Sequence, residues 1–176
     1  MVDVILAANF HNHLTMWTCH LCHQHFVREN QYHSCRDKQI TDFFKSKPKE
    51  VLELFDHLVI TFQQLGDVNY HATKSMIAFS VKTRIAWITR VGRNFIDVSF
   101  MFNRPFNDNL CFYRIGQVHG TEQYNHYFRM MYNDDVNDEV KHFMQLAINE
   151  NEKQYHERWQ PYIFCQKPMI QSPLTH

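Results

Sequence analysis

Cysteine and histidine side chains near the N-terminus form a pattern that suits a tetrahedral zinc ion. Cys19 and Cys22 form a Cys-x-x-Cys pair, and His33 and Cys35 follow after a short spacer. Thiolates and an imidazole are preferred zinc ligands, and a Cys-x-x-Cys pair supplies two of them from one turn. Four protein ligands close the coordination shell, so we predict a structural Zn²⁺ rather than a catalytic one.

Two alternatives to this ligand set stay open at the level of sequence. His20, His23 or His25 could replace His33 as the nitrogen ligand, or the thiols could be reduced cysteines without metal. About thirty residues cannot bury enough apolar surface to fold alone. Bound metal would therefore supply the folding energy of this segment.

The composition is that of a core-forming chain without net charge. The 176 residues are 44% hydrophobic and 15% aromatic, and 18 basic residues balance 18 acidic ones. This balance argues against a protein that coats nucleic acid generally, but it permits a local basic patch. Cys111 and Cys165 lie far apart among aromatic residues, which favours buried thiols over a disulfide framework.

The sequence contains no segment with the pattern of a signal peptide or a membrane span. An acid, Asp3, stands where a signal peptide carries lysine or arginine, and the apolar run around it is short. No other apolar run approaches the length that crosses a bilayer. We therefore expect a cytoplasmic protein with no membrane partner.

Hydrophobic periodicity predicts an α+β fold, with an antiparallel meander sheet flanked by two helices and preceded by the small zinc finger. The expected divisions are a leader at 1–16, the finger at 17–40, the α+β domain at 41–153 and a proline-containing tail at 154–176.

Individual elements follow from the same patterns. Ser46-Lys47-Pro48 is a helix-start signal, and apolar residues at helical spacing carry that helix to about Leu65, where Gly66 ends it. A second helix is expected to begin at Asn133-Asp134-Asp135 and to lose its pattern after Gln154. Period-two alternation predicts strands at 68–71, 76–81, 85–89, 95–102, 110–118 and 124–131.

A polar turn after the first strand is one candidate for ligand binding. His71, Thr73 and Lys74 offer an imidazole, a hydroxyl and an ammonium at a strand junction, a set that can hold a phosphate or an acidic polymer. The alternative is a turn whose lysine simply faces water.

A second candidate lies on the last predicted strand. Alternation places His126 and Phe128 on one face of the strand, and Tyr127 and Arg129 on the other. Arg129 is an anion partner if it points into a cleft and an ordinary surface charge if it points outward. Asp97 interrupts an apolar strand, so we expect it either on the solvated face or paired with a basic residue.

Sequence motifs of the common catalytic classes are missing. The chain has four glycines and no Gly-rich phosphate loop, no Gly-x-Ser-x-Gly elbow and no His-Glu-x-x-His pair. Cys111 and Cys165 have no local context that would activate a thiol.

Several of these motifs together resemble a known family. Trp17-x-Cys19-x-x-Cys22-x-x-x-Phe26 and His33-Ser34-Cys35 look like the short finger that precedes an uncharacterised bacterial domain, the domain-of-unknown-function family numbered 5655. The segments that extend the resemblance over roughly residues 17–150 are His71-Ala72-Thr73-Lys74, Ile96-Asp97-Val98, His126-Tyr127-Phe128-Arg129 and Asp134-Asp135-x-x-Asp138. Proline commonly stands in that family where this chain has Ala72, and often where it has His20.

The resemblance implies an α+β domain of unknown activity that genomic context often links to nucleotides or nucleic acids. It makes five positions the expected ligand site, namely His71, Thr73, Lys74, His126 and Arg129. The leading hypothesis is a zinc-stabilised module that binds an anionic ligand, a nucleic acid or a nucleotide. The alternatives are a protein-interaction scaffold and an enzyme on a phosphorylated or nucleotide substrate.

Overall fold

The computed structural model describes residues 17–21, 23, 25, 26, 29, 30, 32, 33, 35 and 38–163, with the side chains of 25, 152 and 154–163 excepted. In chain order its elements are β1 (Trp17–Thr18), β2 (His25–Phe26), α1 (Ile40–Phe44), α2 (Lys49–Leu65), β3 (Asn69–Ala72), β4 (Ile77–Ser80), β5 (Arg84–Val91), β6 (Ile96–Phe102), β7 (Arg114–Gln117), β8 (Tyr124–Met130), η2 (Asn133–Asp135) and α3 (Asp138–Ile163). The predicted α+β class is confirmed.

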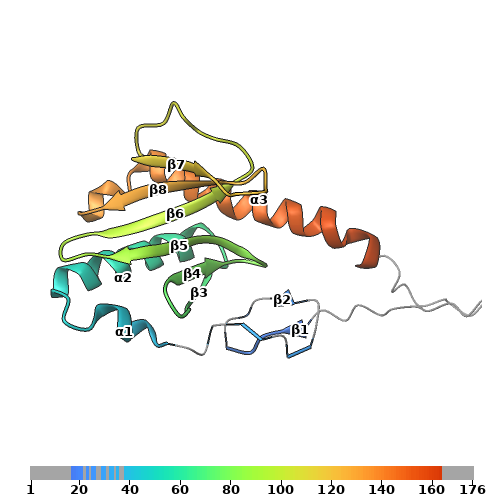
Figure 1. The fold of residues 1–176 in the computed structure, drawn as a ribbon, viewed down its shortest axis with the longest axis horizontal. Coiled ribbons are helices and arrows are strands. Elements are labelled where there is room, and N and C mark those ends of the chain that lie inside the picture. Colours follow the sequence, from blue (N-terminus) through green and yellow to red (C-terminus); the bar gives the residue numbers. More distant parts are fainter. Residues whose placement is uncertain are drawn as a thin grey trace, which may run out of the picture.

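The main sheet has six strands, and every pairing in it is antiparallel. Its order is β3-β4-β5-β6-β8-β7, while β1 and β2 form a separate two-stranded ribbon. Consecutive strands pair from β3 to β6, as in a meander. The chain then bypasses one position, places β7 at the edge and returns with β8 between β6 and β7 (Figure 1).

Burial explains why β8 takes the inner position. His126, Phe128 and Met130 alternate along β8 and are all buried. In contrast, β7 is four residues long and contains no buried residue. An inner strand must present apolar side chains to the core, whereas a short polar strand is well suited to an edge.

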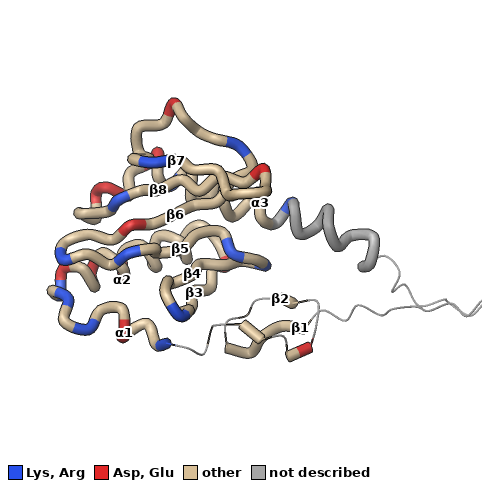
Figure 2. The backbone as a smooth tube through the Cα atoms, in the orientation of Figure 1, with Lys and Arg blue, Asp and Glu red and all other residues tan. Residues whose placement is uncertain are grey.

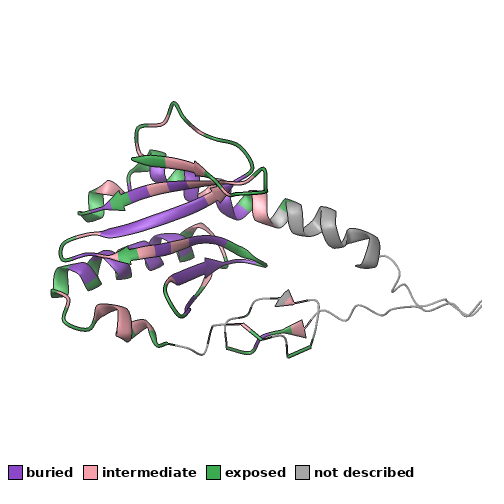
Figure 3. Cartoon of the chain, viewed as in Figure 1, coloured by how far each residue is buried: buried purple, intermediate pink, exposed green. Residues whose placement is uncertain are grey.

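Both long helices pack on the same face of the sheet. α2 contacts β6 and α3, and α3 contacts β5 and β6 (Figure 1). Phe62 of α2 stacks on Phe79 of β4 with ring centroids 4.6 Å apart, and Phe143 of α3 lies 6.0 Å from Phe102 of β6. The core therefore lies between the sheet and these helices, and Figure 3 shows buried residues along β4 and β6 and on both helices.

The structure refines the expected ends of the two helices. Pro48 is the N-cap of α2, so the helix begins at Lys49, and it ends at Leu65 as Gly66 predicted. α3 begins at Asp138 after the short η2 turn. Its backbone continues to Ile163, beyond the expected break at Gln154. Among the described helices, none is both long enough and apolar enough to cross a membrane.

Truncating the central ring of the core should destabilise the fold strongly. Phe62 is fully buried and contacts rings of two strands, so we expect Phe62→Ala to lower the free energy of unfolding by about 3–5 kcal/mol. Leu52 lies on the same helix but is 40% exposed, so Leu52→Ala is the matched control and should cost much less. Urea denaturation followed by circular dichroism measures both. Equal losses would show that α2 does not pack as described.

Candidate functional site

Three of the four predicted metal ligands meet in the N-terminal segment. One ligand atom from each of Cys19, His33 and Cys35 lies within 4.8 Å of the other two. Cys19 is buried, and the other two are half-buried. Cys22 lies outside the described residues. Of the histidines weighed as replacements, His20 and His23 are exposed, and neither belongs to this group.

The donor geometry can be compared with a tetrahedral zinc site. Two thiolates bound at about 2.3 Å lie about 3.8 Å apart, and a thiolate and an imidazole nitrogen lie about 3.6 Å apart. The Sγ atoms of Cys19 and Cys35 are 3.8 Å apart, as required. The Cys35 Sγ–His33 Nε2 distance is 3.0 Å, so this pair would have to separate by about half an ångström.

Neighbouring groups support the same cluster. The backbone N–H of Leu21 donates to Cys19 Sγ at 3.4 Å, a hydrogen bond that stabilises a thiolate. The His33 ring lies 4.3 Å from the Phe26 ring and 6.0 Å from the Trp17 ring, measured between centroids. These residues could hold a metal ion, with aromatic rings shielding one side of it.

In the turn between β3 and β4, Thr73 has a local structural role. Its Oγ1 donates to the carbonyl of Met76 and accepts from the N–H of the same residue, which closes the turn. Lys74 is exposed beside it. His71, two residues before Thr73, is 8% exposed, and its Nδ1 has no hydrogen-bond partner among the residues that the structure describes. Burial, together with the charges of Arg84 and His33, lowers the pKa of His71 to about 4.

His126 lies inside the helix-facing core. The N–H of Phe106 donates to Nε2 at 3.1 Å, so Nε2 is unprotonated and Nδ1–H donates to the carbonyl of Tyr124 at 3.1 Å. The rings of Phe102, Phe106 and Phe112 lie edge-on at 5.0, 5.5 and 5.0 Å. This histidine is fully buried and anchors the loop that leads to β7.

Arg129 is neither isolated nor free in solvent. Its Nε and Nη2 donate to the two carboxylate oxygens of Asp97 at 2.7 and 3.0 Å. Of the two states expected for Asp97, solvated or paired with a basic residue, the structure has the paired one. The hydrogen bond from Asp97 raises the pKa of the Arg129 guanidinium, which stays charged. The guanidinium also lies 4.0 Å from the Phe95 ring centroid and 5.3 Å from that of Tyr113.

The five predicted ligand residues do not come together. His71 and Lys74 belong to the β3 edge, and Arg129 belongs to β8, with β4, β5 and β6 between them. Four strand spacings correspond to about 19 Å. His126 faces the core, on the opposite side of the sheet from Arg129. His71 and Arg129 share one face of the sheet, by the pairing register of their strands.

That face, opposite α2 and α3, carries a continuous row of aligned residues. Cross-strand partners run from β3 to β7 without interruption. In order they are His71, Ala78, Trp87, Ser99, Tyr127 and Arg114, which we call the ring row. Planar side chains alternate with Ala78 and Ser99, so each small residue leaves space between two rings.

An arginine–aromatic cluster adjoins the ring row. Arg90 and Arg129 both lie over the Phe95 ring, and the Arg114 guanidinium is 5.0 Å from the Tyr127 ring centroid. Tyr113, which is 53% exposed, connects these groups, since its ring is 6.2 Å from that of Tyr127. We define the cluster as Arg90, Phe95, Tyr113, Arg114, Tyr127 and Arg129.

A glycine fixes the ring at the centre of the cluster. A Cβ atom at Gly92, in the turn between β5 and β6, would approach the Phe95 ring to 2.4 Å. Glycine is therefore required for the ring to fold back over the turn. This close approach holds Phe95 where both arginines contact it.

Charge and unpaired polar atoms also distinguish this face. The six strands contain four arginines, Arg84, Arg90, Arg114 and Arg129, and one acid, Asp97, which is already paired. Figure 2 shows that positive residues predominate on the strands. Four buried side-chain atoms of described residues without hydrogen bonds are His71 Nδ1, Ser80 Oγ, Ser99 Oγ and Asn125 Oδ1. By alternation along their strands, all four residues face away from α2 and α3.

Most of this site is absent from the motif-based prediction. Alternation places Tyr127 and Arg129 together, but no sequence motif singles out Trp87, Phe95 or Tyr113, and Arg114 is only one of several arginines that could pair with Asp97. Only the pairing register brings them to one face. The excess of arginine over acid within the predicted strands was the available signal.

Removing His126 should change how stability depends on pH. Burial lowers the pKa of this imidazole, so the folded state resists protonation. The contribution of neutral His126 to stability is therefore complete above about pH 6.5, the pKa of histidine in an unfolded chain, and it is lost as the pH falls towards the folded pKa. We expect His126→Gln to have a shallower loss of unfolding free energy below about pH 6.5. Urea titrations at several pH values measure the slope. Phe106→Leu, which loosens the same contact but retains the imidazole, should keep the wild-type slope; a parallel His126→Gln curve would contradict this assignment.

Comparison with known proteins identifies the domain. No curated protein and no solved structure matches this chain in the searches made. A family model described as a domain of unknown function (DUF5655) matches residues 40–151, from the start of α1 into α3. The match covers well over half of the sequence and excludes the N-terminal cysteine cluster. The chain therefore belongs to the DUF5655 family.

Proposed function

We propose that the domain binds single-stranded nucleic acid across the sheet face that carries the ring row. The observation that carries this proposal is the coincidence of aligned planar side chains and exposed arginines on a face that no described helix covers. Bases stack on aromatic rings whatever their sequence, while arginines neutralise phosphates. A local basic surface of this kind is compatible with a neutral chain.

The ring row offers stacking positions for successive bases. Trp87 and Tyr127 stand on either side of Ser99 and are half-buried, so their rings keep exposed surface. Arg114 lies at the end of the row, next to the Tyr127 ring, where it can pair with a phosphate. The pair with Asp97 holds the Arg129 side chain in one orientation while leaving it 41% exposed. A preorganised cation loses less conformational entropy when it binds.

The two alternatives have less support. An enzyme would need His71 or His126 close to an acid or a lysine, yet no ion pair in the described part of the chain includes either histidine. A scaffold would need a broad exposed apolar patch. The exposed face described above is instead polar and aromatic.

We also propose that the N-terminal cluster binds one structural Zn²⁺ through Cys19, His33 and Cys35, with Cys22 as the fourth ligand. A closed shell of four protein ligands leaves no open position for a substrate. The metal would thus have a structural role, which is to order the N-terminal segment, and the open sheet face would carry the binding function. The thiol donors and their separation support this assignment.

Removing one arginine of the face should weaken oligonucleotide binding and reduce its salt dependence. Each phosphate contact contributes about 0.7 to the slope of log affinity against log salt for a single strand. We expect Arg114→Gln to lower that slope by about this amount. Fluorescence anisotropy with labelled oligothymidylate at several salt concentrations measures it. Arg104 lies in the loop after β6 and pairs with Glu150 of α3, so Arg104→Gln is the control. Equal effects of the two variants, or no binding at low salt, would refute the proposal.

Removing one stacking ring should weaken binding independently of salt. Loss of a base–ring contact costs about 1–3 kcal/mol, so Tyr127→Ala should reduce affinity for a single strand by about 5- to 150-fold. Tyr127→Phe keeps the ring and should bind nearly as well as the wild type. The same anisotropy assay compares them. If the phenylalanine variant loses as much affinity as the alanine variant, stacking is not the interaction involved.

Replacing a metal ligand should remove zinc. We expect purified Cys35→Ser to lose about one equivalent of zinc and the order of the N-terminal segment, because metal binding supplies its folding energy. Cys111→Ser is the control, since Cys111 lies outside the cluster. Elemental analysis and hydrogen exchange of residues 17–35 measure the two effects. Wild-type protein without zinc after expression in zinc-supplied medium would exclude this assignment.

A further inference from the structure

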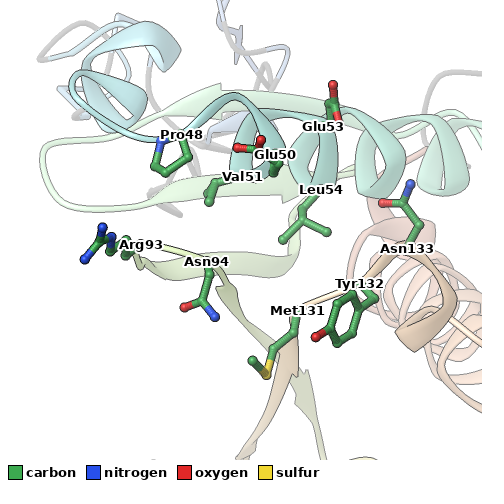
Figure 4. A pocket seen from close by; sticks show the side chains of 10 residues that line it. All are labelled: Pro48, Glu50, Val51, Glu53, Leu54, Arg93, Asn94, Met131, Tyr132 and Asn133. Carbon is green, nitrogen blue, oxygen red and sulfur yellow. The ribbon is translucent and has the colours of Figure 1, made fainter.

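A cavity of about 730 Å³ lies beside the arginine–aromatic cluster and has no role in the function proposed so far. Its walls come from the start of α2, the turn between β5 and β6 and the residues after β8 (Figure 4). This volume is in the range of cavities that hold small organic ligands.

The interior of the cavity combines apolar walls with an amide. Figure 4 shows Val51 and Leu54 pointing from α2 towards the strands, with Met131 and Tyr132 on the opposite side and Asn94 between them. Tyr132 is 69% exposed, so its ring is available to a ligand. Val51 and Leu54 are 0% and 6% exposed, so they belong to the core beneath the cavity, and the accessible phenol ring and amide are the groups that suit a flat heterocycle with polar edges.

Several polar groups around the cavity have nothing to bind in the described part of the chain. No hydrogen bond or ion pair within that part involves the side chains of Glu50, Arg93, Asn94 or Asn133. In contrast, Glu53 at the rim pairs with Lys49 at 2.8 Å. The unpaired set offers a carboxylate and two amide oxygens as acceptors, with one guanidinium to meet an anion.

The cavity lies on the α2 side of the sheet, and the chain segments that line it adjoin those of the arginine–aromatic cluster. Arg93 and Asn94 directly precede Phe95, and Met131 and Tyr132 directly follow the end of β8, which carries Arg129. A strand of nucleic acid whose phosphates contact Arg90 and Arg129 would reach the cavity by passing over the end of the sheet, at the turn between β5 and β6.

We propose that this cavity receives the base of one nucleotide, at one end of the bound strand, and selects bases with an exocyclic amino group. Tyr132 stacks on the base, Asn94 and Glu50 accept hydrogen bonds from its amino group, and Arg93 pairs with its phosphate. Adenine, cytosine and guanine carry that amino group, whereas thymine and uracil present a carbonyl oxygen instead. This inference rests on the proposed function, which by itself predicts no preference for a terminal base.

The test compares oligothymidylates that differ in one terminal nucleotide. Each carries dA, dC, dG or dT at its 5′ end or at its 3′ end, and affinities are measured by anisotropy with an internal label. We expect an amino-bearing base at one of the two ends to raise the affinity of wild-type protein about tenfold over dT. Asn94→Ala and Tyr132→Ala should abolish this preference. Asn107→Ala, at an exposed position in the loop after β6, is the control and should retain it.

The outcomes separate this inference from the function on which it rests. Tyr127→Ala should weaken all the oligonucleotides alike and leave the terminal preference intact. Binding that depends on Tyr127 but ignores the terminal base at both ends would overturn the cavity assignment and leave the proposed function standing. A terminal preference that survives Asn94→Ala and Tyr132→Ala would also overturn it. Absence of binding by every oligonucleotide would overturn both.

Discussion

The packing of both long helices on one face of the sheet is the constraint on which the rest of the structure depends. Phe62 and Phe143 reach from α2 and α3 into the same aromatic core, so alternate residues of the strands are committed to it. The intervening residues lie on a face without a described helix. Because side chains alternate along a strand, the choice of which face meets the helices also places Trp87, Tyr127 and Arg129 on the other face.

The pair between Asp97 and Arg129 connects stability with the candidate site. Asp97 is almost fully buried, and its charge is compensated by two hydrogen bonds from one guanidinium. A buried carboxylate without a partner would be costly, so the arginine is held in place by the needs of the fold. The same guanidinium lies against Phe95 and Tyr113. It therefore orients one half-buried and one exposed ring while it satisfies a buried acid.

Particular residues show how far sequence reasoning reached. Helical spacing located α2, and alternation located all six strands of the main sheet, because the two periods are local properties of the chain. Thr73, His71 and Lys74 correctly marked a turn at a strand junction. The distance between that turn and Arg129 could not be predicted, because it depends on three intervening strands. Burial of His126 also escaped prediction, since alternation gives two faces without saying which one meets the helices.

The sequence by itself determined the α+β class, the elements and the spacing of the thiol and imidazole groups near the N-terminus, since these depend on residues close together in the chain. It also limited Asp97 to a solvated or a paired state. Only the tertiary structure decided that β8 lies inside β7, that Trp87 and Tyr127 share a row, and that Asn94 and Tyr132 line one cavity. Those neighbours are distant in the chain. Local sequence patterns allow several strand registers equally well, and the burial of apolar surface in the folded chain selects one of them.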